Sequence, residues 1–320
     1  MSNITPIDNN TYAIDAYYGY PLHACVYLVE DNGEYALIDC GTTKSEIYIM
    51  GALAKLGVDP QAVKYILPTH VHLDHAGGTG VLSKRLPNAK VYVHPYGHRH
   101  LIDPTKLNAA SLVIYGEYMM NFAVGKAQPV AADICYELED NQELSLGNNK
   151  LLVQFTPGHA KHHCSFFDPK SGNYFGGDVL GNSYESMRSD DKSLMFLCSA
   201  PIDYNGEDWH NSLDKIASLS PKRVCLCHYG AINNPQSAFE DMHRLIDKND
   251  RLAMDLLDIE DDAARRKAIE QMIWGLFWDE FATRKSPMHK EHAEKWMEKD
   301  VYISTEGIAH WLKNLRKNKN

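Results

Sequence analysis

The stretch from Ile66 to Gly78, ILPTHVHLDHAGG, places three histidines and one aspartate within six consecutive residues. Apolar residues at its start have the pattern of a buried strand, which therefore ends directly on the histidines. Neutral imidazoles and a carboxylate are ligands that borderline divalent metals take in proteins. Four such side chains at this spacing predict a metal site, formed by His70, His72, Asp74 and His75.

The composition limits what this site can serve. The chain has 320 residues and a net charge of −10, which argues against a nucleic-acid or anionic-membrane surface, because both need clustered lysines and arginines. No uncharged apolar run approaches the roughly 20 residues of a membrane span, and residues 1–15 lack the regions of a secretory signal. Seven cysteines, an odd number set mostly singly among apolar residues, suit buried free thiols. We therefore expect a cytoplasmic protein with a small-molecule substrate and no nucleic-acid or membrane partner.

The order of the predicted elements divides the chain into two parts. Short β-branched and aromatic runs around a DNGE turn come first, and alternating strands and helices follow as far as residue 95. Residues 96–125 have a mainly helical pattern, and residues 143–178 form a second run of strands. From residue 235 on, only helical patterns occur. We expect a catalytic α/β domain over residues 1–235 and a helical extension over 236–320, which serves as a lid, as packing or as a homodimer surface.

Three more ligand-type residues stand at the ends of apolar strands. LLVQFTPGH ends on His159, NYFGGD ends on Asp178, and RVCLCH ends on His228. Each alone has an ordinary interpretation, as a turn-capping aspartate or a histidine at a sheet edge. Because functional groups of α/β folds gather at the carboxyl ends of strands, the three together complete a set with the first cluster.

The ordered motifs THVHLDHAGG, TPGHAKHH, FGGDV and CLCHYG resemble the metallo-β-lactamase superfamily, in the glyoxalase II and lactonase type with two metals. The resemblance covers residues 10–232 and includes LIDCG, which is similar to the family's Asp-x-Gly turn. It implies a four-layer αββα sandwich with the site at one edge of the two sheets. The helices after residue 235 are an addition to that fold.

The resemblance also implies a ligand set. The first metal is held by His70, His72 and His159, and the second by Asp74, His75 and His228. Asp178 bridges the two ions, and Asp39 of LIDCG orients a ligand imidazole. Two divalent ions are expected, with Zn²⁺ as the favoured metal and iron or manganese as alternatives.

The activity implied by this set is hydrolysis. A hydroxide that bridges the metals attacks an ester-like bond, a thioester or lactone before a phosphodiester, and Asp74 is the candidate catalytic residue. A persulfide dioxygenase is the alternative, since that class shares most of these ligands but uses one iron, two histidines and one aspartate. The candidate substrate contacts are Tyr18, Tyr20 and His23 between the first two strands, His94 at the end of VYVH, and Tyr184 after Asp178.

Overall fold

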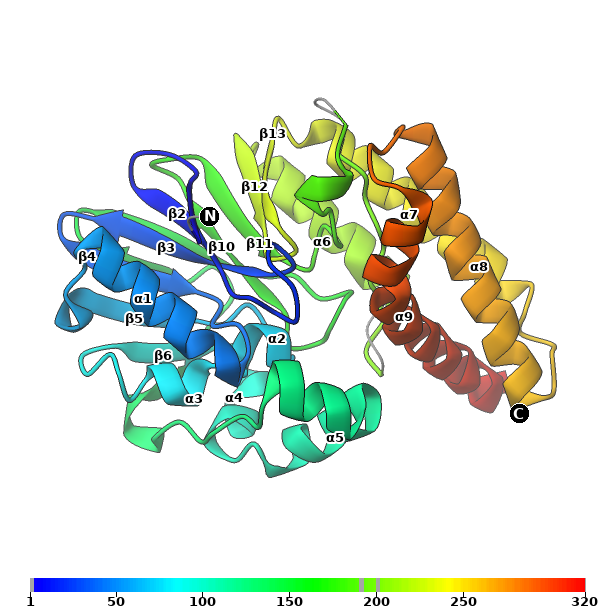
Figure 1. Cartoon of the computed structure of the whole chain (residues 1–320), viewed down its shortest axis with the longest axis horizontal. Coiled ribbons are helices and arrows are strands. Elements are labelled where there is room, and N and C mark those ends of the chain that lie inside the picture. Colours follow the sequence, from blue (N-terminus) through cyan, green and yellow to red (C-terminus); the bar gives the residue numbers. More distant parts are fainter. Residues whose placement is uncertain (1–2, 190–192, 200–201, 320) are drawn as a thin grey trace. The chain divides into compact units, whose positions relative to one another are not determined.

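The computed structural model describes residues 3–189, 193–199 and 202–319 (Figure 1). They fold into two compact units. The first unit comprises residues 1–155, 162–177 and 221–233, and the second comprises residues 156–161, 178–220 and 234–320. The second unit is therefore larger than the predicted extension 236–320, because it includes two earlier segments of the chain. Among the described residues, no helix is both long enough and apolar enough to cross a membrane.

Both sheets of the structure belong to the first unit. The first sheet has a mixed arrangement, antiparallel as far as β4 and parallel from β4 onward. The β3–β4 hairpin turns at Asn32 and Gly33, both with positive φ, which is the two-residue turn that the DNGE sequence predicts. In spatial order, the strands of the first sheet are β1 (Ile4–Pro6), β2 (Thr11–Asp15), β3 (Cys25–Asp31), β4 (Glu34–Ile38), β5 (Val63–Leu67), β6 (Lys90–Val93) and β7 (Cys135–Glu137).

The second sheet follows the order β13-β12-β11-β10-β9-β8 and is antiparallel except between β11 and β12. Its strands are β8 (Glu143–Leu146), β9 (Asn149–Phe155), β10 (Cys164–Asp168), β11 (Asn173–Gly177), β12 (Arg223–Leu226) and β13 (Gly230–Asn233). One buried cluster joins side chains of both sheets, among them Tyr27, Phe166 and Phe175. Because alternate residues of a strand face opposite sides, Val26 and Leu28 of β3 join a different core.

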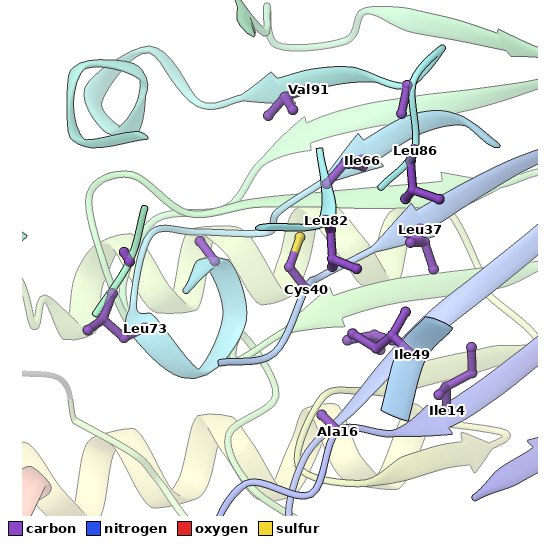
Figure 2. Close-up of a cluster of buried hydrophobic side chains, with 14 of the residues drawn as sticks. Ile14, Ala16, Leu37, Cys40, Ile49, Ile66, Leu73, Leu82, Leu86 and Val91 are labelled. Atoms are coloured by element: carbon purple, nitrogen blue, oxygen red, sulfur yellow. The ribbon is translucent and has the colours of Figure 1, made fainter. Parts of the chain in front are cut away.

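That other core lies between the first sheet and the helices of the first unit. Figure 2 shows side chains from strands, such as Leu37 and Ile66, meeting side chains from helices, such as Ile49 and Leu82. The first of these helices ends at Gly57, whose φ of 72° suits a glycine cap. The helices are α1 (Glu46–Leu56), α2 (Leu73–Ala76), α3 (Thr79–Leu82), α4 (Pro95–Ile102) and α5 (Thr105–Met119), with a π-helical turn at Met120–Val124.

The main secondary structure of the second unit is helical. The expected helices after residue 235 are present, and α8 buries apolar side chains at helical spacing, among them Ile269, Ile273 and Phe277. Arg244 of α7 binds Glu280 of α8 through two hydrogen bonds of 2.6 and 3.0 Å. The helices are α6 (Gly206–Ser218), α7 (Gln236–Met254), α8 (Asp262–Thr283) and α9 (Lys290–Lys319).

Candidate metal centre

In the first unit, three strands end at candidate site residues. β4 ends before Asp39, β5 ends before the histidine cluster, and β12 ends before His228. β4 and β5 are parallel neighbours, and the Asp39 amide donates to the Leu67 carbonyl at 3.0 Å, so both ends lie at one edge. The second sheet is tied to the same edge, because the Cys164 amide donates to the Thr69 carbonyl at 2.7 Å. The topology therefore gathers residues that are up to 189 positions apart, from 39 to 228.

Asp39 organises the first histidine through Thr69. The Asp39 carboxylate accepts from the Thr69 amide at 2.8 Å and from the Thr69 hydroxyl at 2.9 Å. Since that hydroxyl gives its proton to Asp39, it can only accept from Nδ1 of His70, which lies 3.1 Å away. The Nε2 atom of a neutral His70 then carries a lone pair, 2.9 Å from Nδ1 of His72. Asp39 itself has a φ of 61°, a conformation that a non-glycine residue adopts rarely and mostly where its surroundings require it.

Two further histidines of the first unit have the same protonation pattern. His75 Nδ1 donates to the other Asp39 oxygen at 3.2 Å, and His228 Nδ1 donates to the His23 carbonyl at 2.9 Å. Their Nε2 lone pairs lie 3.8 and 3.6 Å from the same carboxylate oxygen of Asp74. A nitrogen lone pair and a carboxylate oxygen repel each other, so this arrangement of acceptors fits a bound cation.

In the second unit, His159 and Asp178 repeat this arrangement. His159 Nδ1 donates to the Cys198 carbonyl at 2.8 Å, and its Nε2 lies 3.2 Å from an Asp178 oxygen. Trp209 of α6 holds both segments, since its ring contacts the His159 ring edge-on at 5.8 Å and its Nε1 donates to the Val179 carbonyl. The pair therefore presents a lone pair and a carboxylate from a rigid support.

The donor set suits a divalent transition metal. Among the described residues, the side chains that could hold a metal ion are His70, His72, His75, His159, Asp178, Cys227 and His228. The sequence prediction omitted Cys227, which we interpreted as a buried strand thiol, although its place next to His228 is a signal. Imidazole, carboxylate and thiolate together are ligands of zinc.

A comparison of the sequence with known families decides the assignment. The family profile described as the metallo-beta-lactamase superfamily matches residues 19–228, more than half of the chain. The protein belongs to the metallo-β-lactamase superfamily. The matched range includes every residue of the expected ligand set.

Individual members of the superfamily agree with this assignment. Protein ST1585 of Sulfurisphaera tokodaii is 27% identical over 268 residues, 80% of this chain and 92% of its own. A hydroxyacylglutathione hydrolase of Maricaulis maris is 31% identical over 215 residues, 66% of this chain and 60% of its own. The N-acyl homoserine lactonase AttM of Azorhizobium caulinodans is 33% identical over 119 residues, 37% of this chain and 41% of its own. The crystal structure of ST1585 has a TM-score of 0.65 at 21% identity, covering 94% of this chain and 98% of that one. The predicted metallo-β-lactamase fold with extra C-terminal helices is thereby confirmed.

Three of the predicted substrate contacts lie on the segment between β2 and β3. Tyr18 is buried and stacks on the His23 ring, with ring centroids 5.5 Å apart, whereas Tyr20 is 58% exposed. His23 Nδ1 donates to the Tyr18 carbonyl at 3.0 Å, and the His23 backbone carbonyl accepts from His228. Contact of these three side chains with a substrate stays a prediction.

The other two predicted contacts have structural partners of their own. His94 caps α4, since its Nδ1 accepts from the Tyr96 amide at 3.2 Å, and its ring packs against Phe155. Burial lowers the pKa of His94 to about 4, so the ring is neutral near pH 7. Tyr184 donates to Asp300 at 2.7 Å, and burial together with that carboxylate raises the pKa of its phenol. Substrate contact by either residue stays a prediction.

Two further residues of the first unit support the candidate ligands. Tyr115 of α5 donates to Asp74 Oδ1 at 3.4 Å. Gly177, the last residue of β11, has a φ of 54°, and a Cβ there would lie 2.6 Å from Nε2 of His163 and 2.8 Å from the Thr69 hydroxyl. The second glycine of NYFGGD is therefore required by the close approach of two side chains around the histidine cluster.

Proposed function

We propose that this protein is a hydrolase that uses two divalent metal ions to cleave an ester-like bond. The observation that supports it most strongly is the protonation pattern of four imidazoles. Each has its Nδ1 proton engaged by an acceptor, so each presents an Nε2 lone pair, and three of these lone pairs face a carboxylate of Asp74 or Asp178. Histidines that bind metals are oriented in this way, by an acceptor on the other ring nitrogen. The four residues are His70, His75, His159 and His228.

The proposal assigns His159 and Asp178 to the same centre as His70. Asp178 directly follows Gly177, the last residue of β11, so its Cα lies about 3.8 Å from the end of that strand. His159 comes four residues after Phe155, the last residue of β9. Both strands belong to the second sheet of the first unit, and the order of the motifs is that of the superfamily. Asp178 is the candidate bridge between the two ions.

In this proposal Asp74 and the residues that contact it orient the reacting water. When bound, two divalent ions lower the pKa of a water towards neutrality and polarise the bond to be cleaved. Asp74 accepts from the Tyr115 hydroxyl through Oδ1 and points Oδ2 toward Nε2 of His75 and His228. This position suits a carboxylate that orients the attacking water and accepts its proton. Asp39 keeps the tautomer of His75 correct by accepting its Nδ1 proton.

The substrate class rests on charge and on two relatives. The Maricaulis maris protein is named for hydrolysis of hydroxyacylglutathione, and AttM is named as a lactonase. Both names denote cleavage of an acyl bond, which favours a thioester or lactone over a phosphodiester for this protein. The net charge of −10 agrees, because it disfavours a polyanionic substrate.

Metal and activity measurements on one variant test the proposal. Asp178→Ala is expected to lose metal and hydrolytic activity together, because one carboxylate serves both ions. Asp168→Asn is the matched control: Asp168 is equally buried but ends β10 and accepts from Asn149 at 2.7 Å, so metal and activity should persist. The assay is elemental analysis with a panel of thioesters, lactones and phosphodiesters.

Two results would contradict the proposal. Full metal content in Asp178→Ala would refute the bridging role. One iron per chain, no hydrolysis and sulfur-dependent oxygen uptake would instead establish the dioxygenase alternative. Because a persulfide dioxygenase shares most of these ligands, the metal count and the oxygen uptake separate the two classes, and the ligand set does not.

A further inference from the structure

Two segments of the first unit reach the candidate metal centre and also expose apolar side chains. One is the loop of residues 16–24 between β2 and β3, and the other is α5 with the π-helical turn that follows it. In the loop, the His23 carbonyl accepts from Nδ1 of His228 at 2.9 Å. On α5, the Tyr115 hydroxyl donates to Asp74 at 3.4 Å. Each segment is therefore attached to a residue that the proposed function assigns to the second ion.

The loop and the π-helical turn also touch each other. Gly19 of the loop has a φ of 73°, and a Cβ there would lie 3.9 Å from the Cβ of Ala123 in the turn. Asp15 holds the loop in shape, because its carboxylate accepts from the amides of Tyr17 and Leu22 at 2.9 and 3.0 Å. The two segments therefore form one continuous surface beside the candidate metal centre.

This surface carries four exposed apolar side chains, which we call the apolar patch: Tyr20 and Leu22 of the loop, and Tyr118 and Phe122 of α5 and the turn. Tyr20 directly follows Gly19 and Phe122 directly precedes Ala123, so both rings start from the point where the segments touch. Tyr118 is 74% exposed and Phe122 is 61% exposed, and their rings stack with centroids 5.6 Å apart. Contiguous exposed apolar side chains mark binding surfaces, because covering them with an apolar group removes them from water.

The charge of the two segments indicates the kind of group that they bind. Residues 16–24 contain no aspartate, glutamate, lysine or arginine, and residues 107–125 contain Glu117 alone, in a chain of which 23% is charged. An anionic acyl group would therefore find no cation on either segment. An alkyl chain needs none, and it gains from contact with the exposed aromatic rings.

We propose that the apolar patch binds an alkyl chain in the acyl group of the substrate. This inference rests on the proposed hydrolase function and narrows its substrate class to thioesters or lactones of apolar acids. The contacts of His23 with His228 and of Tyr115 with Asp74 place the patch next to the ion that these residues hold in that proposal. A chain on the patch and a scissile carbonyl at the metal centre can therefore belong to one molecule.

Calorimetric titration of the full-length, metal-loaded protein with straight-chain carboxylic acids tests the patch without requiring turnover. The acids run from acetate to octanoate and carry the acyl group of the expected product. The association constant should rise roughly two- to fourfold for each added methylene, as it does when a methylene is buried. Tyr118→Ser and Phe122→Ser should each weaken octanoate binding at least roughly fivefold. Tyr302→Ser, which removes an exposed aromatic ring of α9, is the control and should bind as wild type does.

Hydrolysis of the matching thioesters gives a second readout. The ratio of kcat/KM for the octanoyl and acetyl thioesters should exceed one in wild type and should fall in Phe122→Ser. Both altered side chains are exposed, and circular dichroism checks that the variants fold. Affinities that do not depend on chain length would overturn the proposal, and a wild-type dimer that dissociates in Phe122→Ser would then assign the patch to a second copy of the chain. Acid binding that rises with chain length, without hydrolysis of any thioester, would support the patch and contradict the proposed hydrolase function.

Discussion

Substitution of Asp39 is predicted to affect the binding of only one of the two proposed metal ions. It accepts from the Thr69 amide and hydroxyl through one oxygen and from His75 through the other. In Asp39→Asn the amide oxygen can still accept from Thr69, so the orientation of His70 is kept. The amide nitrogen, however, faces His75 and forces its proton from Nδ1 to Nε2. This substitution should therefore weaken the binding of the ion that His75 is proposed to hold, and should leave the binding of the ion at His70 unchanged.

The magnitude follows from the contacts of this carboxylate. Replacing its charged hydrogen bond to His75 should lower the free energy of unfolding of the metal-free protein by about 2 kcal/mol. Loss of the partner that orients a metal-binding histidine weakens metal affinity roughly 10- to 100-fold, or about 1.4 to 2.7 kcal/mol. Asp39 is buried, so solvent does not compensate for either loss.

Zinc competition against a chromophoric chelator measures this effect. The wild type should bind two zinc ions with similar affinity, and Asp39→Asn should bind one of them roughly 10- to 100-fold more weakly. Asp59→Asn is the control, because Asp59 is an exposed N-cap and asparagine caps equally well. Equal weakening of both ions, or of neither, would refute the assignment of His75 and His70 to different ions.

Two further predictions concern stability. Gly177→Ala should lower the free energy of unfolding in denaturant by roughly 2–5 kcal/mol, since a positive φ costs roughly 1–2 kcal/mol and overpacking against His163 and Thr69 adds roughly 1–3 kcal/mol. Gly33→Ala has the same kind of φ and open space, so it should lose the backbone cost alone, and equal losses would contradict the close approach. Burial lowers the pKa of His94 to about 4, so the folded protein keeps this ring neutral between pH 6.5 and 4. The unfolded chain binds a proton there below about pH 6.5. The free energy of unfolding of the wild type should therefore fall by up to roughly 3 kcal/mol between pH 6.5 and 4. His94→Asn keeps a capping acceptor and should lack this part of the pH dependence in urea titrations, and an unchanged slope would show that the burial is not its cause.

The sequence allowed the fold and the candidate ligands to be predicted because both depend on local pattern. His70 and His75 share one short stretch, and His159, Asp178 and His228 each follow an apolar strand. Parallel and sandwiched strands bring such ends to one edge, so the positions of the residues along the chain were informative. All seven cysteines are buried, as their apolar surroundings predicted.

Other features left no readable pattern. The acceptor that orients His228 is a backbone carbonyl, which any residue provides, so His23 was predicted for its side chain instead. Tyr115 and Trp209 reach their partners from helices far along the chain. His94 precedes Pro95, and a polar residue before a proline is typical of a helix start, so its capping role had a signal, although we predicted His94 as a substrate contact.

We propose that this protein hydrolyses an acyl bond with two metal ions held by oriented imidazoles. The most direct test is to add zinc stepwise to metal-free protein and to follow hydrolysis of a thioester and a lactone. Activity should rise until two equivalents of zinc per chain are bound and should then stay constant. Activity that is complete at one equivalent, or protein that is active only with iron and consumes oxygen, would contradict a hydrolase with two metal ions.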